Sequence, residues 1–406
     1  MEQLSKMYVF SKKLLAQSKY MNFIFNFFLF VYYIKMDNIL YLSADPEARQ
    51  SSYTENNNVD FILAVGEGRS LVRNSVRLNG RINITSDGTT TSAGKCFLDF
   101  RIGTHALIQS IQTTFNGNNQ GLKESIQNYG RWCEMTSIAT LQEDDYNNAL
   151  MQCELRAPNE LCSAIISQGI TTLGTSPLSR NMDFSCKPLM CLNKMMGDHL
   201  PFEKSGEIRV SFDLARNMSA LMGANQGSAS KYELFDLHVS YQSVPTMGNP
   251  MDARIAMRSV YNVKQAILSG SANIVAVCPT QADAVSVSFQ RQSNENVNVF
   301  NNYACEQVPG ITNLQFLFND STNKYVTYEQ LDLNSMLKGY VNSFENTGHQ
   351  QVSLDTLRNN AGFGVGQAFA GFTNFANQRF SMQLRSDINN TRPMNCYIYF
   401  HSIIQA

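Results

Sequence analysis

Charged residues are scarce in this 406-residue chain. Lys, Arg, Asp and Glu make up 16% of it, and the formal net charge is −1, whereas globular domains carry about 25% of such residues. A polar but weakly charged surface favours extensive packing against other protein, because charged residues are depleted at the centres of interfaces. The near-neutral balance argues against a surface dedicated to nucleic acid, so no specific nucleic-acid partner is expected.

Metal-binding patterns are also lacking. No two histidines share an HxH, HxxxH or HExxH spacing, so the clustered ligands of a two-cupin enzyme are absent from the sequence. The one acidic cluster, Glu143 to Asp145, has adjacent carboxylates instead of the spaced ligands of a calcium loop. The five histidines are His105, His199, His238, His349 and His401. Their patterns place His238 and His401 on the polar or outer faces of strands.

Catalytic motifs are missing as well. The pairs Gly66/Gly68 and Gly364/Gly366 lack the third glycine and the strand–helix context of a dinucleotide site, and no GxSxG or GxxxxGK motif occurs. We therefore predict no enzyme, no catalytic, cofactor-binding or metal-binding residue, and no small-molecule substrate. Three arginines project from one polar face of a predicted strand or its approach, and we expect them on a solvated or interface face. They are Arg73, Arg77 and Arg81.

The nine cysteines are irregularly spaced and form no CxxC pair. This excludes a zinc site or a thioredoxin-like motif of the usual spacing. Several of them, such as Cys96 and Cys396, fall within apolar strand patterns. We predict small buried side chains with free thiols, as in a protein of a reducing compartment.

Residues 1–35 differ from the rest of the chain. The apolar run Tyr20–Ile34 is shorter than the ~20 residues that span a bilayer, and no small-residue cleavage site follows it. It is either a membrane-associating or partner-binding arm, or an upstream extension of a protein whose translation starts at Met36. We favour the extension, in which case 1–35 is not part of the mature protein. With the polar arm that follows, residues 1–58 form an N-terminal extension and arm.

Alternating apolar and polar residues dominate from residue 59 onward. Ile208, Val210, Phe212 and Leu214 alternate with polar residues, and a second alternating run follows a polar loop. That layout of two runs around a polar loop returns at residues 380–404. A strict period of two predicts half-buried strands. We infer two β-modules in tandem, over residues 59–247 and 248–406.

Each module has roughly eight short strands and one helix, which is the strand count of a jelly roll. The predicted fold is all-β, with two tandem jelly-roll sandwiches and short helices in the connecting loops. Further strands are expected near 61–65, 76–84, 96–102, 106–115, 258–268, 272–278, 285–289, 314–318 and 363–372. Helices are expected over 121–140, 144–154 and 327–344, with a long inserted loop at 141–180.

Four stretches resemble a known family. They are RNSVRLNGRINI at 73–84, IGTHALIQSIQTTFNGNNQGLKESIQNY at 102–129, VPGITNLQFLFNDSTNKYVTYEQ at 308–330 and NQRFSMQLRSDINNTRPMNCYIYFHSII at 377–404. They look similar to the double jelly-roll major capsid proteins of small tailless icosahedral DNA viruses, most closely Polinton-like viruses and virophages. The resemblance covers residues 59–406.

The resemblance implies a structural role without catalytic residues or cofactors. Three chains would form a homotrimer whose six barrels make a pseudo-hexagonal capsomer, and capsomers would tile an icosahedral shell together with penton and minor capsid proteins. The protein would be located in the virion after assembly inside the host cell. The alternatives are a penton or minor capsid protein of the same viruses, or a non-viral, lectin-like β-sandwich binding protein.

The last strand is apolar on both faces. Cys396, Ile398 and Phe400 alternate with Tyr397 and Tyr399. When one face of a strand packs in its own core and the other face carries aromatic side chains, another segment must pack on those aromatic side chains. We expect a neighbouring chain or a long loop to cover these tyrosines.

Overall fold

The computed structural model describes residues 39–405 with gaps. Those gaps are residues 65, 86–96, 100, 118–120, 142–152, 157–181, 223–230, 250–254, 280, 298–301, 307, 319–322, 329–332, 346–363 and 375–378. The extension 1–35, the acidic cluster at 143–145, Cys96, His349, most of the predicted 144–154 helix and most of the 141–180 loop therefore lie outside the described residues.

The first half of the chain forms a β-sandwich, here called the first sandwich. Its strands are β1 (Leu40–Ala44), β2 (Asn58–Leu63), β3 (Arg69–Val72), β4 (Arg77–Thr85), β5 (Phe97–Leu98), β6 (Ile108–Phe115), β7 (Gly121–Gln127), β8 (Met182–Cys186), β9 (His199–Pro201), β10 (Ile208–Leu214), β11 (Leu221–Met222) and β12 (Lys231–Pro245). One sheet has the order β8-β4-β12-β3-β9, with β1 also paired to β12, and the facing sheet has the order β2-β10-β6-β7. The alternation that predicted these strands places Val210 and Phe212 inward, where Phe61 meets Phe212 edge-on.

The second half forms the second sandwich. Its strands are β13 (Ala256–Ile267), β14 (Ser271–Val277), β15 (Gln281–Arg291), β16 (Asn313–Phe318), β17 (Asn323–Tyr328), β18 (Val365–Asn374), β19 (Arg379–Arg385) and β20 (Met394–Gln405). The two sheets have the orders β13-β20-β15-β18 and β14-β19-β16-β17. Each described ladder is antiparallel and joins strands of the same sandwich. Outside the named strands, an isolated bridge between Met195 and Met257 links the two halves.

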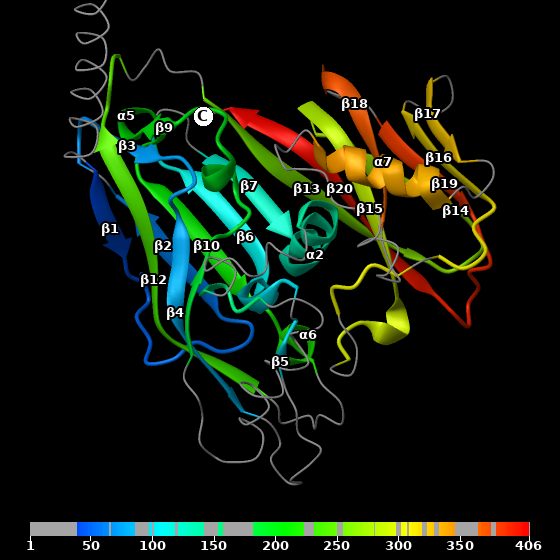
Figure 1. Ribbon diagram of the computed structural model, residues 1–406, viewed down its shortest axis with the longest axis horizontal. Helices are drawn as coiled ribbons and strands as arrows, with labels where there is room; N and C mark the ends of the chain where they lie inside the picture. The colour runs from blue at the N-terminus through cyan, green and yellow to red at the C-terminus, as the bar shows by residue number, and fades with distance from the viewer. Residues whose placement is uncertain are drawn as a thin grey trace, which may run out of the picture.

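Helical segments, most of them short, connect the strands. The helical segments are η1 (Gly103–Leu107), α2 (Tyr129–Thr140), η5 (Cys191–Lys194), α5 (Phe202–Ser205), α6 (Asn217–Ala220), η7 (Gln292–Asn294) and α7 (Leu333–Glu345). Figure 1 shows α2 in the middle of the molecule, with the first sandwich on the left and the second on the right, where α7 packs on β18 and β15. Buried hydrophobic residues of both sandwiches belong to one continuous cluster, so the two halves share a core.

The predicted helix over 121–140 is partly wrong. Residues 121–127 form β7, which pairs with β6, and only residues 129–140 are helical. Leu122 and Ile126 have helical spacing, but the β6 ladder places Glu124 and Ile126 on the buried face and leaves Leu122 exposed. Asn128, with a left-handed φ of 52°, makes the turn from strand to helix. Tertiary pairing has overridden the local pattern.

Other predicted boundaries also shift. The strand expected at 106–115 begins at Ile108, after the short helix η1. The helix expected at 327–344 begins at Leu333, and the unpredicted strand β17 precedes it. The polar arm is extended as expected, and its residues 40–44 form the edge strand β1 on β12.

The glycines near residue 365 have a packing role. A Cβ on Gly364 would collide with the Val287 carbonyl, and one on Gly366 would collide with Ser343 of α7. The absence of side chains lets α7 lie close against β18 and β15.

Candidate functional site

The junction between the two sandwiches holds the densest aromatic cluster among the described residues. Trp132 of α2 is 1% exposed, and its ring centroid lies 5.5 Å from Phe344 of α7. The same ring lies 5.4 Å from Tyr399 and 5.0 Å from His401, both on β20. A helix of the first sandwich therefore packs directly on the last strand of the second.

The tyrosines of the last strand are covered within the chain. Tyr399 is fully buried against α2, and its hydroxyl donates to the Asn128 carbonyl at 3.1 Å. Tyr397 lies under the Arg131 guanidinium, 4.0 Å from the ring centroid. The expectation that a neighbouring chain or a long loop covers them is therefore wrong. The sequence pattern indicates a cover but does not identify α2, which is about 265 residues away in sequence.

His401 is also placed differently from the prediction. It lies buried between Trp132 and Phe344 and hydrogen bonds with Ser286, and is not on an outer face. Burial and the nearby positive charges of Lys194 and Arg258 lower its pKa to about 3. The imidazole is therefore neutral near pH 7, which suits an aromatic core.

Glu124 ties the two sandwiches together. This buried carboxylate on β7 accepts hydrogen bonds from the Cys191 amide at 2.9 Å and from the Ser259 hydroxyl of β13 at 2.7 Å. Burial raises its pKa, and these hydrogen bonds oppose that rise. An ordinary sandwich surface would expose such a side chain, so its burial indicates that the β7–β13 contact is a permanent part of the fold.

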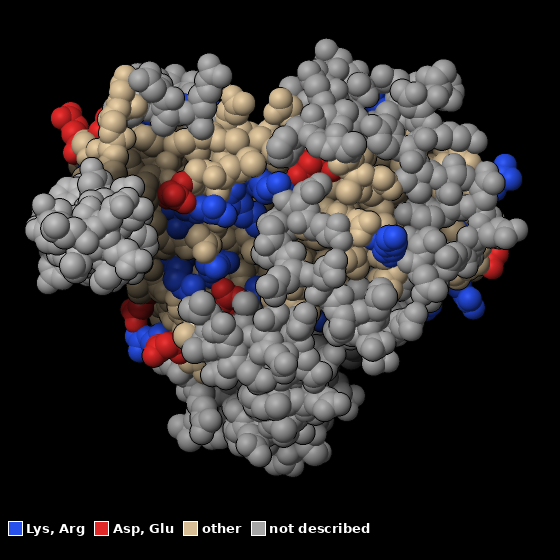
Figure 2. All heavy atoms as spheres, turned by 45° about the horizontal axis from the view of Figure 1, so that its top comes forward, with Lys and Arg blue, Asp and Glu red and all other residues tan. Residues whose placement is uncertain are grey.

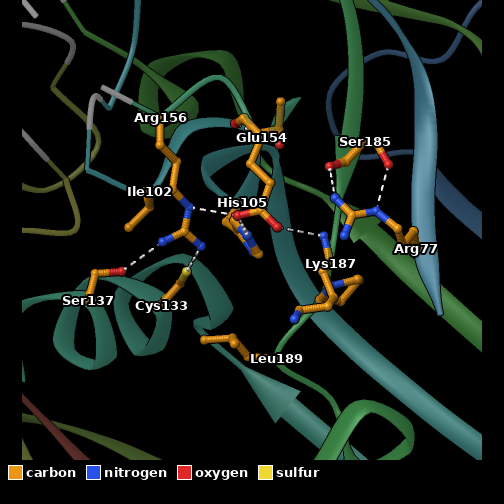
Figure 3. A network of polar contacts seen from close by, with 12 residues as sticks. Arg77, Ile102, His105, Cys133, Ser137, Glu154, Arg156, Ser185, Lys187 and Leu189 are labelled. Atoms are coloured by element: carbon orange, nitrogen blue, oxygen red, sulfur yellow. Dashed lines mark hydrogen bonds and ion pairs between the residues drawn. The ribbon is translucent and has the colours of Figure 1, made fainter. Parts of the chain in front are cut away.

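A second buried network surrounds Glu154 (Figure 3). Its carboxylate pairs with Arg156 at 2.9 Å and with His105 at 3.2 Å, and it accepts a hydrogen bond from the Lys187 amide at 2.9 Å. Burial alone would raise the pKa of Glu154, but the charges of His105 and Arg156 lower it to about 2.

The network joins three segments of the first sandwich. Tyr129 of α2 contacts the His105 Nδ1 through its hydroxyl at 2.6 Å, and the Arg156 guanidinium donates to the Ser137 hydroxyl at 3.1 Å. Gly103, with a φ of 53°, allows the Glu154 backbone to approach η1, where a Cβ would collide with it. The arrangement fixes residues 153–156 against η1 and α2.

The remaining sequence-selected residues do not converge on one site. His199 and His238 are half-buried on separate strands, and Arg77 and Arg81 bind Ser185 and Asp236 of neighbouring strands. Among the described residues, no group of three His, Cys, Asp or Glu side chains could hold a metal ion. No helix in the described ranges is long and apolar enough to cross a membrane.

The cysteines in the described ranges are free thiols. Six of these seven are buried, and Cys153 is exposed. Burial raises the pKa of the Cys278 and Cys305 thiols to about 12. They act as small core side chains, as the strand patterns predicted.

Solved structures share this architecture over most of the chain. PBCV-1 VP54, in a crystal structure fitted into a cryo-EM reconstruction of the virophage Sputnik, is 12% identical, with a TM-score of 0.57 over 90% of this chain and 94% of that one. A PBCV-1 virus capsid model is 13% identical, with a TM-score of 0.56 over 90% and 94% of the two chains. The Faustovirus major capsid protein is 8% identical, with a TM-score of 0.59 over 90% of each chain.

The chain has the double jelly-roll fold. Each sandwich is one jelly roll, and the fold class predicted from the alternating strands is confirmed. The resemblance inferred from the sequence is confirmed at the level of this fold. No protein-family model and no curated protein matches the sequence of this chain.

Proposed function

We propose that this double jelly roll is a structural viral major capsid protein and not an enzyme. The observation that carries the proposal is the match of both jelly rolls, over 90% of the chain, to the folds of a PBCV-1 virus capsid model and of the Faustovirus major capsid protein. The proposed domains are residues 59–247 and 248–406, each one jelly roll. A penton protein with one jelly roll would account for only half of this chain.

The proposed unit is a homotrimer, which forms pseudo-hexagonal capsomers that tile an icosahedral shell. Three two-lobed chains give six barrels around a threefold axis. Cyclic closure requires each chain to present two different patches. Neighbouring capsomers, penton proteins and minor capsid proteins would be the further partners, in the virion of a virus of the Polinton-like or virophage kind.

Exposed apolar side chains at opposite ends of the molecule support such a head-to-tail contact. Tyr41 on β1 is 78% exposed, and Val277 on β14 is 67% exposed. Figure 1 places β1 at the far left and β14 at the far right. Figure 2 shows that uncharged residues make up most of the described surface of one face, while Lys and Arg gather in a hollow near its middle. A surface with few charged residues can be buried between subunits at a small desolvation cost.

The double substitution Tyr41→Ser and Val277→Ser tests this contact. We expect it to weaken trimer formation at least tenfold, because about 1.4 kcal/mol of lost apolar burial produces that change. The thermal midpoint of the monomer should stay within about 2 °C, since exposed side chains contribute little to the fold. Size-exclusion chromatography with light scattering measures the trimer fraction.

Leu122→Ser is the matched control, because Leu122 is 59% exposed but lies on β7, beside β13 and between the two jelly rolls. It should leave assembly unchanged. Trimers that form equally well in the double variant and the control would exclude these two ends as the contact.

A further inference from the structure

A polar cavity of about 350 Å³ lies between the two jelly rolls. That volume falls in the usual range of small-molecule sites. Its walls come from both halves of the chain and include Gln109, Asn128 and Arg131 from the first and Lys264, Glu295 and Tyr397 from the second. A ligand bound here would contact both jelly rolls at once.

One wall carries a buried positive charge. Arg131 is 3% exposed, and its guanidinium donates to the backbone carbonyls of Ala304 at 2.8 Å and Asn302 at 2.6 Å, and to the Gln290 side chain. These acceptors are neutral, and no carboxylate of the described residues lies within ion-pair distance of Arg131. Buried guanidinium groups are usually paired with an anion.

The other charged groups leave the lining positive. Arg216 is exposed at the cavity wall and forms no ion pair with any residue that the structure describes. Lys264 pairs with Glu295 at 2.8 Å, so these two charges cancel. Arg131 and Arg216 remain, two positively charged lining residues that form no ion pair with any residue that the structure describes. A phosphate monoester carries about −1.5 to −2 near pH 7 and offers three acceptor oxygens.

The backbone around the cavity is unusual. Three of the six described non-glycine residues with positive φ line it: Asn56 at 61°, Asn128 at 52° and Asn296 at 54°. The Asn296 side chain is held by a hydrogen bond from Ser219 across the wall, at 2.7 Å. Left-handed residues cost energy and cluster at ligand-binding positions.

We propose that this cavity binds a phosphate dianion, either free or as the phosphate of a small phosphomonoester. The ligand sits against Arg131 and Arg216, and the remaining volume accommodates an organic group. Because it contacts both jelly rolls, binding stabilises their packing. This inference does not depend on the capsid proposal.

Isothermal titration calorimetry and thermal melting of the full chain test the proposal with three probes: inorganic phosphate, adenosine monophosphate and adenosine, all at one ionic strength. Phosphate and the monophosphate should bind saturably and raise the melting midpoint by about 1–3 °C, while adenosine should do neither. Tighter binding of the monophosphate than of phosphate would identify a phosphomonoester as the ligand. Equal binding would identify free phosphate.

Arg216→Gln is the main variant, because its exposed side chain is not needed for folding. It should weaken binding of either phosphate probe about three- to tenfold. Arg73→Gln removes the same charge at an exposed position that does not line the cavity, and it should leave binding unchanged. The proposal is overturned if neither phosphate probe binds below about 10 mM, if Arg216→Gln and Arg73→Gln bind alike, or if adenosine binds as tightly as its monophosphate.

Discussion

Replacing Trp132 with alanine is expected to lower the free energy of unfolding by about 3–5 kcal/mol, the usual cost of truncating a buried aromatic side chain. The ring is 1% exposed and contacts Phe344, Tyr399 and His401. Its removal leaves a void between α2, α7 and β20. Urea denaturation followed by circular dichroism measures the change.

Trp132→Phe should recover most of the loss, because a smaller ring still fills part of the void. Tyr261→Ala is the control. Tyr261 is an aromatic residue on the neighbouring strand β13, but it is 44% exposed, and its truncation should cost less than about 1 kcal/mol. A loss below about 1 kcal/mol for Trp132→Ala would show that α2 does not join the two jelly rolls.

Replacing Glu154 with glutamine is expected to lower the free energy of unfolding by about 3–5 kcal/mol, because removing one partner of a buried ion pair leaves the other charge uncompensated. Arg156 and His105 would both lose their carboxylate. The shape of the side chain is kept, so packing changes do not account for the loss. The readout is the urea midpoint near pH 7.

The pH dependence gives this prediction a second readout. The folded-state pKa of Glu154, about 2, lies below its ordinary value of 4.5. The contribution of the ionised carboxylate to folding stability is therefore fully present above pH 4.5 and is lost as the pH falls toward 2. The stability gap between wild type and Glu154→Gln should narrow over that window. Glu207→Gln, at an exposed position, should change neither the midpoint nor the pH profile, and an equally small effect of Glu154→Gln would refute the network's role.

The strands were largely predictable from the sequence. Runs such as Ile208 to Leu214 alternate strictly because one face meets the core and the other meets water. β7 was missed because Leu122 and Ile126 also fit a helix, and only the ladder with β6 selects the strand. β17 was missed because a helix was extended back over it.

The junction could be predicted only in part. The aromatic residues on both faces of β20 indicated a cover, but the covering residue Trp132 comes from a helix far away in sequence. The predicted outer position of His401 is wrong, because the alternation shows which face of the strand a residue lies on but does not show which segments pack against that face. The sequence pattern does not predict the buried network of Glu154, the burial of Arg131 or the cavity. Each depends on contacts between segments that only the folded chain brings together.

The mass of the wild-type particle in solution tests the capsid account most directly. Light scattering coupled to size-exclusion chromatography should give three times the chain mass of 45.6 kDa, together with larger particles at higher concentration. A stable monomer at high concentration, with neither a trimer nor any larger particle, would contradict it.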